Sequence, residues 1–77
     1  MDLRDVLATN IRRLRHEKGL TQEELADAAG VNRTYMSKVE TAQTYAGLEI
    51  IARLAISLEA EPHELLIPTR KKATGKR

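Results

Sequence analysis

Apolar residues recur at helical spacing at both ends of the chain. One apolar stripe predicts a helix from about residue 3 to residue 18, and it consists of Leu3, Leu7, Ile11 and Leu14. A second helix, from about residue 48 to residue 58, is expected to bury Leu48, Ile51, Leu54, Ala55 and Leu58. No strand-like alternation of useful length occurs, so the pattern predicts helices alone.

The central stretch, residues 21–40, predicts two short helices separated by a tight turn. Thr21 is a good N-cap, and Glu24 three residues later completes a capping-box pattern. Gly30 ends this helix because glycine accepts a left-handed backbone, and Asn32 can cap the next helix. Ala26 is small enough to let the two helices approach closely. The apolar positions of the second helix are Tyr35, Met36 and Val39.

The remaining segments complete an all-α fold of five short helices. Residues 41–47 form a polar connection, and Glu61-Pro62 predicts the start of a short fifth helix, because proline is favoured in a first helical turn. That helix would hold Leu65, Leu66 and Ile67. We expect residues 1–67 to form one domain. Residues 68–77 lack apolar periodicity and are expected to be a disordered basic tail.

Charge is distributed unevenly along the chain. Residues 1–67 carry 8 Lys/Arg and 11 Asp/Glu, a net charge of −3, whereas residues 68–77 carry 5 Lys/Arg and no acid, which gives +5 and a total of +2. A basic folded surface therefore cannot be inferred from the total. The tail is either a solvated charge run or a flexible arm that adds nonspecific phosphate contacts.

Composition excludes several classes of protein. The chain contains no cysteine, which removes disulfides and thiolate metal sites. No apolar run approaches the roughly 18 residues of a membrane span, and no secretory signal opens the chain. His16 and His63 lie on separate helices, and no glycine-rich phosphate loop is present. We expect a cytoplasmic protein that is not an enzyme and has no metal, no cofactor and no membrane partner.

The stretch GLTQEELADAAGVNRTYMSKVE resembles the signature of the Xre/Cro/CI helix-turn-helix family of bacterial and phage regulators. The similarity continues through LEIIARLAISLEAEPHELL and covers roughly residues 5–67. It implies a five-helix, lambda-repressor-like domain that binds double-stranded DNA and regulates transcription. The segment NRTYMSKVE is especially similar to controller proteins of restriction–modification systems.

The resemblance assigns roles to individual positions. The second helix of the motif, at about 32–40, would enter the major groove, where Arg33, Thr34 and Lys38 would contact bases. Contacts to the DNA backbone would come from Gln22, Asn32, Tyr35, Ser37, Thr41 and Gln43. For Tyr35 an alternative is a core position with its hydroxyl at the surface. The basic side chains near the end of the first helix, Arg12, Arg13, Arg15 and Lys18, either complement the helix dipole or include one or two phosphate contacts.

Family likeness also implies an ion pair between Arg15 and Glu40 that fixes the angle between helices. The chain departs from the family at three positions: Ala42 and Ala46 replace a glycine and a proline, and Glu59 stands where a helix-ending glycine is common. The first two changes allow a different path for the connecting loop and affect the phosphate contacts expected after Thr41, and the third affects the turn into Glu61-Pro62.

The resemblance further implies a homodimer, because pairing two units about a two-fold axis places their recognition helices one DNA turn apart, roughly 34 Å. A hypothetical dimer interface would contain Ile50 or Ile56 together with Ala60 and Ile67; the alternative is that the isoleucines are additional core. The first hypothesis is therefore a DNA-binding regulator of a palindromic operator. The second is an antitoxin or other protein-binding module that uses DNA binding for autoregulation, with a toxin or RNA polymerase as partner.

Overall fold

The computed structural model describes residues 2–69, which form four α-helices and one 3-10 helix, with no strand among them. The α-helices are α1 (Leu3–Glu17), α2 (Gln22–Ala29), α3 (Arg33–Glu40) and α4 (Leu48–Ser57). The 3-10 helix, η1, comprises Pro62–Leu65. No helix in this part of the chain is long and apolar enough to cross a membrane. Residues 70–77 of the predicted basic tail lie outside the described residues.

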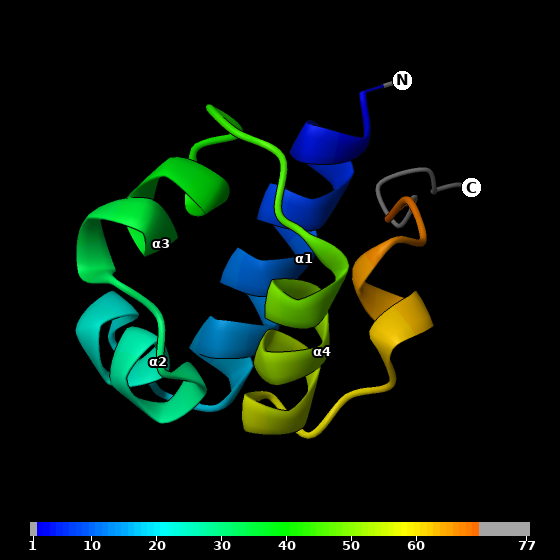
Figure 1. Cartoon of the computed structure of the whole chain (residues 1–77). Helices are drawn as coiled ribbons and strands as arrows, with labels where there is room; N and C mark the ends of the chain where they lie inside the picture. The colour runs from blue at the N-terminus through cyan, green and yellow to red at the C-terminus, as the bar shows by residue number, and fades with distance from the viewer. Residues whose placement is uncertain (1, 70–77) are drawn as a thin grey trace.

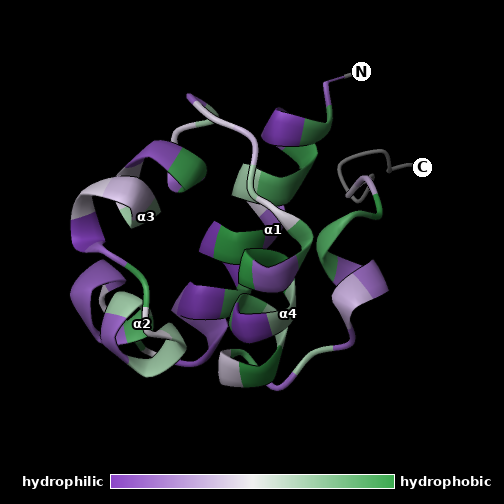
Figure 2. Cartoon of the chain, in the orientation of Figure 1, coloured by the Kyte–Doolittle hydropathy of each residue, from purple (hydrophilic) through white to green (hydrophobic). Residues whose placement is uncertain are grey.

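Helices α1 and α4 form the centre of the molecule, with α2 and α3 on one side and η1 on the other (Figure 1). Hydrophilic residues lie on the outside of this arrangement, and the outer turns of α2 and α3 are mostly hydrophilic (Figure 2). The buried core draws on every helix, and its completely or almost completely covered side chains include Ile11, Leu25, Met36, Leu54, Leu58 and Leu65. Ala26 is also buried, at 1% exposure, as expected of the small residue between α2 and its neighbours.

The predicted helix starts are confirmed by hydrogen bonds. The Thr21 hydroxyl accepts from the Glu24 amide at 3.0 Å, and the Glu24 carboxylate accepts from the Thr21 amide at 2.8 Å, so the capping box is complete. Asn32 Oδ1 accepts from the Tyr35 amide at 3.1 Å at the start of α3. Asp2 caps α1 in the same way, through the Arg4 amide at 2.9 Å. These local bonds satisfy amides that the helices leave free.

All four α-helices end with a residue in the left-handed backbone region. At two ends this residue is glycine, Gly19 (φ 70°) and Gly30 (φ 69°); at the other two it is Ala42 (φ 61°) and Glu59 (φ 56°). Each end carries the paired hydrogen bonds of a Schellman motif, for example Gln43 N to Lys38 O at 2.8 Å after α3. The left-handed turn is therefore kept although alanine and glutamate stand where the family has glycine. Ala42 and Glu59 both hold a strained backbone conformation.

Relief of this strain gives a direct prediction. The substitution Ala42→Gly is expected to stabilise the domain by about 1 kcal/mol and to raise its melting temperature by about 4–8 °C, since a left-handed backbone costs an L-residue about that much. Thermal melts followed by circular dichroism measure the shift. The matched control is Gly19→Ala, where an added Cβ meets no atom within 4 Å, so that strain alone should lower the melting temperature. An unchanged or lower melting temperature for Ala42→Gly would contradict this account.

The C-terminal segment is attached to α1 by a buried polar residue, Asn10, whose role is not visible in the helical pattern of the sequence. Asn10 is 0% exposed, and its amide nitrogen donates to the carbonyl oxygens of Leu65 and Ile67, both at 2.9 Å. Its amide oxygen accepts from the Thr69 hydroxyl at 2.7 Å and from Arg13 at 3.2 Å. The amide is thus fully used, which compensates for its burial. The predicted fifth helix is shorter than expected: it is a short 3-10 helix that ends at Leu65 and leaves Leu66 and Ile67 outside it.

One predicted core position is wrong. Leu48 was expected on the buried face of its helix, but it is 83% exposed because it precedes the turn of α4 that contacts the core. The other predicted positions of that face, Ile51, Leu54, Ala55 and Leu58, are buried. Leu3, at the start of the α1 stripe, is likewise half exposed. Both leucines line an apolar hollow at the same end of the molecule, together with Tyr45 and Leu66.

Candidate nucleic-acid interface

The outer face of α3 carries the polar side chains that the sequence singled out. Positions 33, 34, 37 and 38 share one side of a helix with 3.6 residues per turn, opposite Met36 and Val39, which are 0% and 1% exposed. Burial of the apolar side against the core therefore forces the polar side outward. Arg33, Thr34 and Lys38 are exposed, and Ser37 is half-buried.

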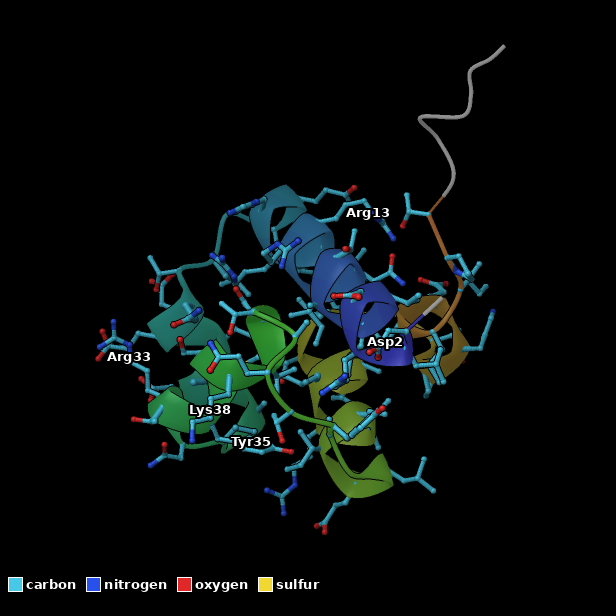
Figure 3. All side chains as sticks on the ribbon, turned by 90° about the horizontal axis from the view of Figure 1, so that it is seen from above. Asp2, Arg13, Arg33, Tyr35 and Lys38 are labelled. Atoms are coloured by element: carbon cyan, nitrogen blue, oxygen red, sulfur yellow. The ribbon has the colours of Figure 1, made fainter. Side chains whose placement is uncertain are left out.

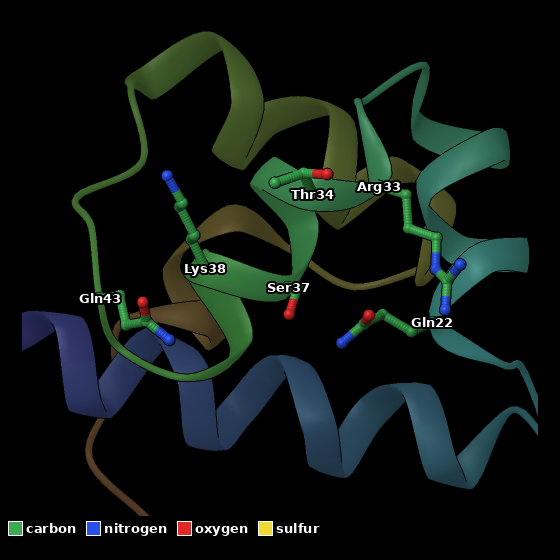
Figure 4. Close-up of a pocket in the computed structure, with 6 residues that line it drawn as sticks. All are labelled: Gln22, Arg33, Thr34, Ser37, Lys38 and Gln43. Carbon is green, nitrogen blue, oxygen red and sulfur yellow. The ribbon is translucent and has the colours of Figure 1, made fainter.

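This face borders an open hollow of about 470 Å³ lined by Gln22, Arg33, Thr34, Ser37, Lys38 and Gln43 (Figure 4). Gln22 comes from the first turn of α2, and Gln43 from the connection after α3. In Figure 4 the guanidinium of Arg33 lies near Gln22 at one end, and Lys38 and Gln43 lie at the other. The structure thus brings together all three predicted base-contacting residues and three of the six predicted backbone-contacting residues.

The other three predicted backbone-contacting residues do not line the hollow. Asn32 uses its side-chain oxygen to cap α3. The Thr41 hydroxyl donates to Ser37 O at 2.8 Å and accepts from Gln43 Nε2 at 2.7 Å, so it stabilises the end of the helix. Tyr35 packs against the core, and its hydroxyl donates to Tyr45 O at 3.3 Å, which agrees with the core alternative left open for this residue.

A buried ion pair between α1 and the end of α3 lies next to the hollow. Glu40 is 2% exposed, and its carboxylate accepts from Arg15 Nε at 2.8 Å and from Arg15 Nη2 at 3.0 Å. Arg15 also donates to Leu20 O at 3.0 Å, and Gln22 Nε2 donates to the same carboxylate at 3.3 Å. Through these bonds Glu40 joins the end of α3 to α1, to the turn between α1 and α2, and to the first residue of α2. The carboxylate itself is shielded from the hollow.

Most other basic side chains of the described residues are paired with acids away from α3. Arg4 contacts Asp2 at 2.7 Å, and its hydrogen bonds lower the pKa of the Asp2 carboxyl to about 2, while Asp2 raises the pKa of Arg4. Lys18 contacts Glu59 at 2.6 Å and lowers the pKa of that carboxyl. The remaining exposed pairs are Arg13–Glu17 and Arg53–Glu49. Figure 3 places Arg33 and Lys38 together on one side, apart from Arg13.

Comparison with known proteins identifies the family. Residues 6–66 match the helix-turn-helix domain family. The crystal structure of the hypothetical transcription factor NHTF from Neisseria superposes with a TM-score of 0.87 at 42% identity, covering 92% of this chain and 82% of that one. The restriction–modification controller protein C.AhdI from Aeromonas hydrophila gives a TM-score of 0.78 at 40% identity, covering 80% of this chain and 94% of its own. The control protein C.SmaI from Serratia marcescens is 36% identical, over 86% of this chain and 79% of its own length.

The chain belongs to the helix-turn-helix family of transcriptional regulators, and its relatives include controller proteins of restriction–modification systems. The resemblance drawn from the central motif is therefore confirmed.

Proposed function

We propose that this protein binds a palindromic DNA operator as a homodimer and thereby regulates transcription. The observation that carries the proposal is the exposed row Arg33, Thr34 and Lys38 on α3, in a domain whose family consists of transcriptional regulators. In this proposal α2 and α3 are the helix-turn-helix, and α3 is the recognition helix that enters the major groove.

The side chains around the hollow suit the two kinds of contact that a regulator makes. Arg33 can bond bidentately to guanine, and the methyl group of Thr34 can contact the thymine methyl group. Gln22, Ser37 and Gln43 offer amide and hydroxyl groups to phosphate oxygens on either side of the recognition helix. Gln22 also begins α2, where free backbone amides and the helix dipole favour an anion.

Binding to a randomised pool of DNA at about 150 mM salt, followed by sequencing of the retained molecules, tests this function. The expected result is a palindromic motif with half-sites about ten base pairs apart, which establishes specificity and two-fold pairing together. Weak, sequence-independent retention that disappears as salt is added would contradict the proposal.

The proposed homodimer requires an exposed apolar surface, and the four residues expected at the dimer interface differ in how exposed they are. Ile50 and Ala60 are partly buried and pack against the core, so they offer less area to a partner than a fully exposed residue. Ile56 is 77% exposed and Ile67 is 52% exposed. Leu48, the first residue of α4, is 83% exposed and lies near the opposite end of this helix from Ile56. We propose that the two exposed apolar residues of α4, Leu48 and Ile56, together with the apolar hollow beside Leu48, form the pairing surface.

The substitution Leu48→Lys is expected to shift the protein from dimer to monomer at micromolar concentration, because it places a charge in the apolar contact. Sedimentation velocity measures the change, and the melting temperature at a concentration where the protein is monomeric should stay the same, since Leu48 makes few core contacts. The control is Thr9→Lys, which adds the same charge at an exposed position of α1. A wild-type protein that is monomeric both with and without operator DNA would overturn the pairing hypothesis.

A further inference from the structure

Three basic side chains in residues 2–69 have no carboxylate partner among the described residues: Arg12, Arg33 and Lys38. The other five of the eight in this range are all in ion pairs. Two of the unpaired cations belong to the proposed recognition helix. We infer that the third, Arg12, binds a DNA phosphate at the end of that helix; the inference rests on the proposed function.

The position of Arg12 follows from the one hydrogen bond that its side chain makes to another described residue. Arg12 projects from α1 and donates through Nη1 to the carbonyl oxygen of Glu40, the last residue of α3. The chain then turns through Thr41 to Gln43, which lines the hollow. Figure 4 shows α1 passing along the hollow on the side of Gln43, Ser37 and Gln22. The guanidinium of Arg12 therefore lies at the end of α3 where the proposed phosphate contacts continue.

The chemistry of this position suits a phosphate. A guanidinium has five N–H donors in a planar fork, and the carbonyl of Glu40 uses only one of its nitrogens. That bond fixes the orientation of the side chain, so that less conformational entropy is lost when a further acceptor binds. Arg12 is exposed, and no carboxylate of the described residues neutralises it. Charge-assisted bonds from arginine to phosphate are among the stronger hydrogen bonds of proteins.

The basic side chains near the end of α1 were expected either to complement the helix dipole or to include one or two phosphate contacts, and three of these four side chains are in ion pairs. Arg15 forms the buried ion pair with Glu40, and Lys18 forms an exposed ion pair with Glu59. Arg13 bonds to Asn10 and Glu17 on the side of the C-terminal segment. A purely structural role for Arg12 would be to complement the negative end of the α3 dipole. Such a role affects folding, whereas a phosphate contact affects the salt dependence of DNA binding.

The experiment measures affinity for the operator selected by the wild-type protein as a function of salt concentration. For Arg12→Gln we expect a loss of about tenfold or more in affinity, and a slope of log K against log salt that is smaller by about 0.9 for each protomer bound. The base preference in a repeated selection should not change, because phosphate contacts carry no sequence information. Arg12→Lys should retain the slope.

The matched control is Arg13→Gln, which removes the same charge from the adjacent position and should leave slope and affinity as in the wild type. Each of the two variants, Arg12→Gln and Arg13→Gln, is also made separately in the Ala42→Gly background and compared with Ala42→Gly alone. The stability expected from Ala42→Gly offsets any stability that is lost with the bond from Arg12 to the end of α3. A wild-type slope for Arg12→Gln, with the operator still selected, would overturn this inference and leave the proposed function standing. Failure of the wild-type protein to select any site would overturn both.

Discussion

Replacement of Glu40 by alanine is expected to destabilise the domain by about 3–5 kcal/mol, a large part of the stability of a chain this short. The reason is the environment of its partner, since the Arg15 side chain is only 12% exposed and would be left without a counter-charge. The bond from Gln22 to the same carboxylate would also be lost. Thermal or urea unfolding followed by circular dichroism gives the magnitude.

Two comparisons distinguish the cost of a stranded charge from the loss of any ion pair. Glu49→Ala removes an acid that pairs with Arg53 on the exposed face of α4, and it should change stability by less than about 1 kcal/mol. Replacement of both Arg15 and Glu40 by leucine should recover stability relative to Glu40→Ala, because no buried charge remains. If Glu40→Ala melted with the wild-type protein, the structural role of this pair would be refuted.

Replacement of Arg33 by alanine is expected to weaken operator binding by about 1–3 kcal/mol for each half-site and to relax the base preference at one position of the motif. A bidentate arginine–guanine pair supplies both effects, and a contact to phosphate supplies only the first. The side chain is exposed on α3, so stability should change by no more than about 0.5 kcal/mol. Titration of labelled operator and a repeated selection measure the two effects.

The control for this substitution is Arg53→Ala, which removes an exposed arginine from α4, where it pairs with Glu49 instead of lining the hollow. Its affinity for the operator should remain close to that of the wild type. A uniform loss across all sequences for Arg33→Ala would reassign Arg33 to the DNA backbone. Unchanged affinity would remove it from the interface.

The starts of the helices could be predicted from sequence because each depends on residues within three positions of one another. Thr21 with Glu24, and Asn32 with the amide of Tyr35, form their bonds inside one helical turn. The departures from the family at Ala42 and Glu59 were also visible, but their effect on the backbone was not. A left-handed residue is costly and still occurs when the surrounding hydrogen bonds impose it, as they do after α3 and α4.

The sequence by itself determined the family, the four α-helices and the outward row of Arg33, Thr34 and Lys38, since all of these follow from local periodicity and one continuous motif. Tertiary structure alone decided which side chains from distant segments meet. It assigned Asn10 to the carbonyls of Leu65 and Ile67, and it left Arg12 as the cation of α1 with no carboxylate partner in residues 2–69. Such contacts depend on how helices pack around a shared core, and helical periodicity gives the face of a residue but not the neighbour that covers it.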